Sequence, residues 1–384
     1  MAPFDILSND SIRDIAISLS LREIKDFCLT NTRFNRIIGR DEGFWHRKFV
    51  HDFDFNPSDY RGSWRQLYQN YTNVWVCGAN NWGQLGLGQI QRVKQVNVLT
   101  RIQNIKAQQV ACGMFDTIII DLENNVWACG ENKSGQLGLG DTEIRNAPTQ
   151  IPNIKALQVS AGYRHTVIID MENNVWVCGN NDYGQLGLGD TENRNAPTQI
   201  PNINLLGNLL VKDQQVAAGF EHTVLIDMEN NVWICGNNSS GQLGLGDTQP
   251  RYFPTQMPNI KARQIVAGYY HTIMIDLDYN VWVWGQNKFG QLGINQAQTL
   301  VPTRIENINL LGNLLFKAQQ VSSLANHTVI IDLNHNVWVS GENNCAQLGL
   351  GDNQNRSIFT QIPNIKAHQV SVGLGYTVII GMKI

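Results

Sequence analysis

A glycine-rich segment recurs six times along the chain, and this repetition constrains the fold more than any other feature. One copy reads NVWVCGNNDYGQLGLGD, from Asn174 to Asp190. A repeat of roughly 50 residues is typical of propellers and solenoids, in which each unit packs on its neighbours. The other five copies begin at Asn73, Asn125, Asn231, Asn280 and Asn336.

The two ends of the chain interrupt this repeat at different points. A second unit, which reads QVSAGYRHTVIIDMEN from Gln158, precedes most copies of the first. The copy at Asn73 has no such unit before it, and the last unit, from Gln369, has no NVW segment after it. In a closed ring the C-terminal half-repeat completes the N-terminal one. This difference between the two ends of the chain therefore predicts a ring of six repeats, closed by pairing of the N-terminal and C-terminal half-repeats.

Within each repeat the residues favour short β-strands. HTVIID from His165 and NVWVCG from Asn174 are rich in β-branched and aromatic residues. The linking DMENN carries asparagines, which tolerate the positive φ of a tight hairpin. Glycine and proline then mark turns around further extended pieces. About four short strands per repeat, arranged in a ring, predict a mainly β chain with a β-propeller over residues 73–384.

The order of these motifs also carries a family resemblance. GYRHT, NVWVCG, GQLGLGD and the later PT together resemble the repeat of the regulator of chromosome condensation family, from about Asn73 to Ile384. The resemblance implies a propeller, usually of seven blades. We expect six blades here, because no stretch long enough for another blade is left over.

The first fifty residues have a different, helical pattern. Apolar side chains follow the spacing of one helical face, and Asn9 or Asp10 is expected to cap this helix. Ser20 and Glu23 form a capping box for a second helix, and an aromatic-rich third segment begins at Asp41. So small a bundle buries little surface, so a partner or the propeller should support it. The residues on the first helical face are Ile12, Ile15, Ala16 and Leu19.

The N-terminal residues include, in order, Leu7, Asp10, Ile12, Ile15, Leu19, Ile24, Leu29, Arg33, Phe34 and Phe44-Trp45. This order resembles an F-box over residues 1–50, followed by a connecting segment over 51–72 with a short helix from Ser63. Ser8 stands where F-boxes usually have proline. The resemblance implies docking on the Skp-type adaptor of a cullin–RING ubiquitin ligase. The residues expected to form the core or the adaptor interface are Leu7, Ile12, Ile15, Leu19 and Ile24.

Composition excludes several classes of function. The net charge of −3 and the pI of about 6.2 give no general attraction for nucleic acid, so nucleic-acid binding is not expected. No stretch resembles a secretory signal or a membrane span, so no membrane partner is expected. The seven cysteines form no C-x-x-C pair, which favours reduced thiols in the cytoplasm or nucleus.

The repeated polar residues are predicted to be structural, with no catalytic residue, metal ion or cofactor. The histidines of successive repeats should be too far apart to bind one metal, and each is expected to bond to backbone in its own blade. Tryptophan and serine replace the repeated cysteine in two units, which argues against a nucleophile and for packing. The aspartates are expected to serve turns. These sets are His165, His222, His271 and His327; Cys77, Cys129, Cys178 and Cys235; and Asp141, Asp190, Asp247 and Asp352.

Two eight-residue insertions interrupt the repeat, in INLLGNLLVK from Ile203 and INLLGNLLFK from Ile308. If exposed, their leucines would form an apolar patch for a partner; otherwise they lengthen a hairpin that packs on its own blade. The leucines concerned are Leu205, Leu206, Leu209, Leu210, Leu310, Leu311, Leu314 and Leu315.

These features together favour a non-enzymatic substrate receptor. In this hypothesis the N-terminal helices bind the adaptor and cullin of a ubiquitin ligase, and the propeller holds a protein target close to the ubiquitin-loaded enzyme. Two alternatives stay open. One is a guanine-nucleotide exchange factor or chromatin-associated regulator of a Ran-like small GTPase, as the repeat resemblance implies. The other is a protein-binding scaffold with no ligase.

Overall fold

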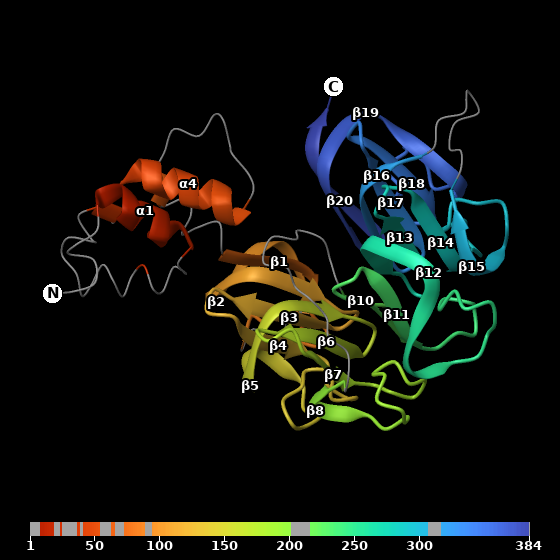
Figure 1. Cartoon of the computed structure of the whole chain (residues 1–384), viewed down its shortest axis with the longest axis horizontal. Helices are drawn as coiled ribbons and strands as arrows, with labels where there is room; N and C mark the ends of the chain where they lie inside the picture. Colours follow the sequence, from red (N-terminus) through yellow and green to blue (C-terminus); the bar gives the residue numbers. More distant parts are fainter. Residues whose placement is uncertain are drawn as a thin grey trace.

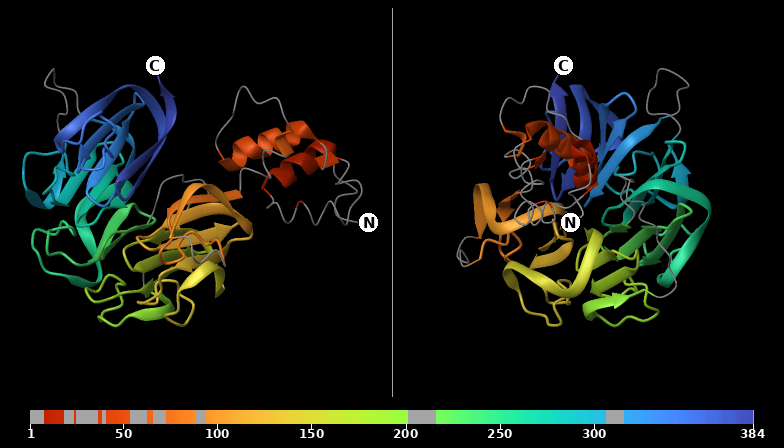
Figure 2. Two further views of the ribbon diagram at one scale, coloured as in Figure 1. Left: turned by 180° about the vertical axis from the view of Figure 1, so that it is seen from behind. Right: turned by 60° about the vertical axis from the view of Figure 1, so that its left-hand side comes forward.

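The computed structural model describes residues 8–18, 24, 37–38, 41–53, 63–65, 73–88, 94–200, 216–305 and 316–383. Beyond residue 72 the described chain is built of β-strands joined by turns, as predicted. The strands follow one another around an arc, from orange at β1 to blue at β20 (Figures 1 and 2). No helix of the described residues is long and apolar enough to cross a membrane.

Long strands tie neighbouring blades together. The first part of β5 (Arg145–Ala161) pairs with β4 (Asn125–Gly130), and its second part pairs with β6 (His165–Asp170). The strand is therefore the outer edge of one blade and the inner strand of the next. Three other strands do the same: β2 (Gln95–Cys112), β12 (Arg251–Ala267) and β19 (Arg356–Gly373).

Five blades have four antiparallel strands each. Blade I joins the second part of β2 to β3 (Asp116–Asp121), β4 and β5, and blade II joins β5 to β6, β7 (Val175–Gly179) and β8 (Arg194–Gln199). Blade III contains β9 (Val216–Ala218), β10 (His222–Ile226), β11 (Asn231–Gly236) and β12. Blade IV joins β12 to β13 (His271–Asp276), β14 (Val281–Gln286) and β15 (Gln298–Arg304), and blade V contains β16 (Ala318–Leu324), β17 (His327–Asp332), β18 (Asn336–Gly341) and β19.

The remaining strands form two half-blades. Half-blade N consists of β1 (Asn73–Ala79) and the first part of β2, and half-blade C consists of the second part of β19 and β20 (Tyr376–Lys383). The core lies between the blades, where apolar side chains of neighbouring sheets interdigitate. In one such cluster Ile118 and Val126 of blade I pack with Ile168 of blade II.

The predicted pairing of the two halves is not found among the described strands. Among the described strands β1 pairs only with β2, and β20 only with β19, and the two lie at opposite ends of the arc (Figure 1). The repeat pattern shows which strands are complementary. Closure, however, also requires the rotations from blade to blade to add up to a full turn, and packing sets these rotations. The sequence therefore predicted the strands of the last blade correctly and their pairing wrongly.

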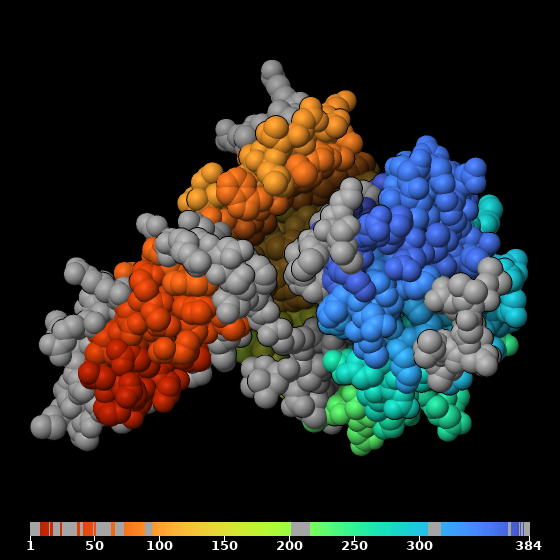
Figure 3. Space-filling model, turned by 90° about the horizontal axis from the view of Figure 1, so that it is seen from above, coloured from red at the N-terminus to blue at the C-terminus, as the bar shows by residue number. Residues whose placement is uncertain are grey.

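The described helices form a lobe beside the N-terminal end of the arc (Figures 1 and 3). Helix α1 (Asn9–Ser18) is capped by Ser8, whose hydroxyl accepts from the amide of Ser11 at 3.0 Å, instead of by Asn9 or Asp10. Asp41 caps α4 (Glu42–Phe53) and binds Arg13 of α1 at 2.8 Å. The predicted capping box of the second helix lies outside the described residues.

Candidate interaction face

The strand directions gather two sets of loops on one face of the arc. In blade II, β6 begins at His165 and ends at the hairpin around Asn173, and β7 returns to the face where β6 began. The loop before each such histidine and the glycine-rich loop after each NVW segment therefore lie on the same side. We call this side the loop face, and the side with the DMENN-type hairpins the hairpin face.

The repeated histidines link neighbouring blades. Nε2 of His165 lies 3.0 Å from Thr223 Oγ1 in the next blade. The hydroxyl of Thr223 in turn donates to the carbonyl of Gln185, so the imidazole must donate its Nε2 proton. Burial lowers the pKa of His165 to about 4 and the pKa values of His222 and His271 to about 3, so these rings are neutral. The expected bond to backbone in the same blade was wrong, because the acceptor is a hydroxyl of the next blade.

Each glycine-rich loop serves the same junction. The carbonyl of Gln136 in such a loop accepts from Thr166 Oγ1 at 2.8 Å and from Cys178 Sγ at 3.5 Å in the next blade. Cys129, Cys178 and Cys235 are buried, and burial raises the pKa values of Cys178 and Cys235 to about 12. A thiol that stays protonated is a poor nucleophile, which supports the packing role. The same two-donor arrangement occurs at Gln84, Gln185, Gln242 and Gln291.

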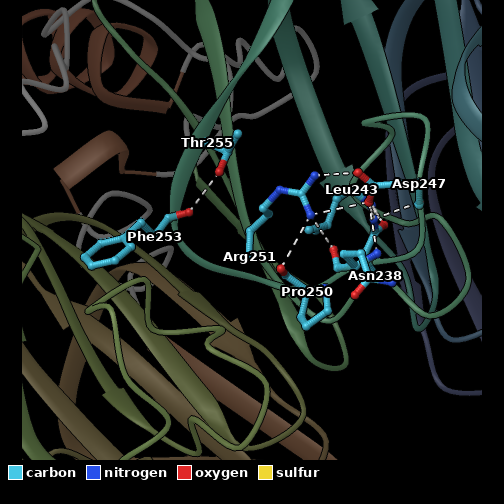
Figure 4. Close-up of polar contacts among 8 residues, drawn as sticks. Asn238, Leu243, Asp247, Pro250, Arg251, Phe253 and Thr255 are labelled. Atoms are coloured by element: carbon cyan, nitrogen blue, oxygen red, sulfur yellow. Dashed lines mark hydrogen bonds and ion pairs between the residues drawn. The ribbon is translucent and has the colours of Figure 1, made fainter.

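The aspartates that end these loops stabilise the turn. Asp247 accepts from Arg251 Nη2 at 2.6 Å and from Asn238 Nδ2 at 2.9 Å, while Asn238 Oδ1 accepts from the amide of Leu243 (Figure 4). The hydrogen bond from Arg251 is the main reason that the pKa of Asp247 lies below its usual range. The predicted turn role is supported, and Asp141, Asp190 and Asp352 make the same ion pair.

One blade replaces its histidine with an acid. Asp116 occupies the histidine position in blade I, is almost fully buried, and has no hydrogen-bond partner on either carboxyl oxygen. Burial, with a contribution from the charge of Glu131, raises its pKa well above the usual range. Within the described part of the chain, no group of three or more His, Cys, Asp or Glu side chains could hold a metal ion.

A row of aromatic rings crosses the loop face, a feature that was not predicted from the sequence. Trp82 contacts Phe115 at 6.1 Å between ring centroids, Phe115 contacts Tyr163 at 6.1 Å, and Tyr163 stacks on Phe220 at 4.0 Å. Phe220 then contacts both Tyr269 and Tyr270, at 4.9 and 5.3 Å. The rings are only partly buried. Trp82 lies on the first glycine-rich loop, and the other rings lie one or two residues before the histidine position in successive repeats, a spacing that could have revealed them.

A contact from one ring of the row links blades I and IV, on opposite sides of the arc. The hydroxyl of Tyr269 in blade IV lies 3.7 Å from Met114 Sδ in blade I, although 155 residues separate them. Two cations already lie on the row. Lys133 Nζ lies 4.5 Å from the ring centre of Trp82, and the guanidinium of Arg164 lies 4.9 Å from that of Tyr163 while it pairs with Glu131 at 3.3 Å. The loop face therefore offers aromatic, cationic and anionic groups side by side.

The other predicted site residues are placed elsewhere or not described. Ile12 and Ile24 are buried in the helical lobe, which fits a core role better than an adaptor interface. Ile15 lies on α1. Leu7, Leu19 and the eight leucines of the two insertions lie outside the described residues, between β8 and β9 and between β15 and β16 for the latter.

Comparison with known proteins agrees with this architecture. Residues 67–264 match the model of the RCC1-like domain, and residues 262–291 and 279–331 match models of the regulator of chromosome condensation (RCC1) repeat. The chain belongs to the RCC1-like domain family. The structure of Prp20p from Saccharomyces cerevisiae is similar with a TM-score of 0.70 and 20% identity, over 82% of this chain and 79% of that one. This likeness supports an RCC1-like propeller fold.

Two curated relatives of this RCC1-like chain match over shorter stretches. The human X-linked retinitis pigmentosa GTPase regulator is 42% identical over 73 residues, 19% of this chain and 7% of that protein. The bovine secretion-regulating guanine nucleotide exchange factor is 35% identical over 121 residues, 32% of this chain and 21% of that protein. The aligned part is thus less than a quarter of each relative.

Proposed function

We propose that the propeller binds a small GTPase of the Ran type through its loop face and promotes release of the bound guanine nucleotide. The observation that carries the proposal is the contiguous, partly exposed aromatic row on that face, because aromatic side chains are enriched where protein partners bind. The repeated histidines and cysteines are used in the blade junctions, which favours a role in binding over chemistry by the chain itself.

The relatives support the same class of partner. One is named a GTPase regulator and another a guanine nucleotide exchange factor. Prp20p, the structural relative from yeast, has binding properties to Gsp1p and to histones. For these reasons the regulator of a small GTPase, first an alternative, now takes precedence over the ubiquitin-ligase receptor.

Nucleotide release provides the test. A Ran-type GTPase loaded with a fluorescent GDP analogue is mixed with the full chain and excess GTP, and the fluorescence decay is followed. We expect acceleration by the wild-type chain, a large loss with Phe220→Ser on the loop face, and no loss with Met228→Ser, an exposed apolar residue of the hairpin face. Absence of acceleration by the wild-type chain would refute exchange activity.

The ligase hypothesis stays a prediction for residues 1–50. The matching family models begin at residue 67, so they do not test whether the N-terminal helices form an F-box. Pull-down with the full chain and with a version that begins at Ser63 tests it. Recovery of the adaptor and cullin only with the full chain would support ligase docking, and recovery with neither would exclude it.

A further inference from the structure

The aromatic row has cations beside its rings at one end and carboxylates without a paired cation at the other. Near Trp82 and Tyr163, the ring faces are covered by Lys133 and Arg164, and Arg164 is also paired with Glu131. At the opposite end, Phe220 and Tyr270 lie beside acids. The first end thus shows, within this molecule, how the row accommodates a cationic side chain: a ring face with a carboxylate next to it.

The second end has the same chemistry without the cation. Glu221 precedes β10, and Tyr270 lies close enough for the Glu221 charge to raise the pKa of its phenol, after the larger effect of burial. Asp182, on the glycine-rich loop of blade II, adds to the burial that raises the pKa of Glu221. Tyr183, 42% exposed, follows Asp182 on the same loop. Direct contacts place this loop and Tyr270 beside Glu221. The Thr223 hydroxyl, two residues after Glu221, donates to the carbonyl of Gln185 on the Asp182 loop at 2.7 Å, and Phe220, which precedes Glu221, has its ring centroid 5.3 Å from that of Tyr270.

Each of these two carboxylates accepts a hydrogen bond from a neighbouring asparagine but forms no ion pair. Asn237 Nδ2 donates to Glu221 Oε2 at 2.7 Å, and Asn180 Nδ2 donates to Asp182 Oδ2 at 2.9 Å. Among the ion pairs of the described chain, none involves Glu221 or Asp182. Two adjacent carboxylates repel each other, and a cation between them relieves this repulsion while it gains contact with the rings.

We propose that Glu221, Asp182, Tyr270 and Tyr183 form a binding site for a lysine or arginine side chain presented by a basic segment of a protein partner. A cation is attracted to a ring face within about 6 Å and pairs with a carboxylate most strongly where water is partly excluded. The site does not require that the partner be a GTPase, so it is independent of nucleotide exchange.

Peptide binding to the full chain tests the site. The probe is a fluorescein-labelled eight-residue peptide with four lysines, compared with one in which glutamines replace the lysines, and fluorescence anisotropy gives Kd. We expect the double variant Asp182→Asn/Glu221→Gln to weaken binding of the lysine peptide about tenfold or more, and Tyr270→Leu to weaken it about threefold to tenfold at unchanged charge.

A matched control separates the site from general attraction to an acidic protein. The double variant Glu172→Gln/Glu229→Gln removes the same charge from exposed positions of the hairpin face and should leave Kd within about twofold. Equal losses with both double variants would overturn the proposal, as would binding of the glutamine peptide as tightly as the lysine peptide or no effect of Tyr270→Leu. Thermal melts confirm that each variant is folded.

Discussion

The five formed blade junctions and the one unformed junction contain the same residues in different surroundings. At each formed junction a glutamine carbonyl accepts from two side chains of the next blade. At the sixth, the carbonyl of Gln347 accepts from Thr377 at 2.7 Å, but Cys77, which occupies the second donor position in half-blade N, is exposed. The contact that seals every other junction is missing.

Exposed apolar side chains mark the same difference. Val110 is 42% exposed, whereas its equivalents in the other repeats, among them Val159 and Val321, are almost fully buried. Trp75 on β1 is 54% exposed. Residues suited to burial therefore lie at the open ends of the arc, where they are exposed to solvent. Complementary sequence is therefore necessary for a closed ring but does not by itself bring the two ends together.

The largest expected effect tests a formed junction. Trp284 is fully buried, and its Nε1 donates to the carbonyl of Gln242 at 2.8 Å. Trp284→Ala should lower the free energy of unfolding by about 3–5 kcal/mol, because it leaves a cavity and removes one of the two hydrogen bonds to that carbonyl. Trp75→Ala removes the same side chain from the exposed β1 and should cost less than about 1 kcal/mol. Urea denaturation measures both, and equal costs would contradict the contrast.

A disulfide can close the arc if its ends meet in solution. The repeat register places Thr377 opposite Cys77, as Thr117 lies opposite Cys129 and Thr166 opposite Cys178. Such partners lie within disulfide distance. Thr377→Cys should then form a bond that raises stability by about 2–4 kcal/mol, visible as a higher Tm lost with reductant. Mass spectrometry identifies the linked peptides. If only free thiols are found under oxidation, the ends stay apart.

A smaller effect is expected from shortening equivalent valines on the inner strands of two blades. Val159→Ala removes buried methyl groups and should cost about 2 kcal/mol. Val110→Ala, at the equivalent position beside the opening, should cost about 0.5 kcal/mol or less. Denaturation curves of the two variants give the difference directly. Equal losses would mean that Val110 is buried in solution and that the ring closes.

The smallest effect is expected at Asp116, which occupies the repeated histidine position in blade I. The pKa of Asp116 is raised in the folded state, so the stability it contributes is present below the unfolded pKa of about 4 and is lost as pH rises toward the folded pKa. Asp116→Asn should therefore stabilise the chain by about 1 kcal/mol at pH 8, with the difference disappearing near pH 4. Thermal melts across this range test it, and a difference that grows toward acid pH would contradict the assignment.

Much of the fold was predictable from the sequence because it rests on local repetition. The strand residues of each blade, the hairpin asparagines such as Asn173 with a φ of 65°, and the turn role of Asp247 all follow from patterns within one repeat. Contacts between repeats were harder. The bond from His165 to the next blade and the stacking of Tyr163 on Phe220 depend on how blades are placed in space. The prediction that the ring closes was wrong for the same reason.

The long strands that pass from one blade into the next also bear on how the chain comes apart. Four of them join blades through continuous backbone, whereas β8 and β9, and likewise β15 and β16, belong to different sheets of the described strands. The sheets accordingly fall into three groups, β1–β8, β9–β15 and β16–β20. Amide protons within one group should exchange together in a shared opening event, and those of different groups should exchange with separate free energies. We therefore expect one repetitive arc to open as three cooperative units, one for each sheet of the described strands.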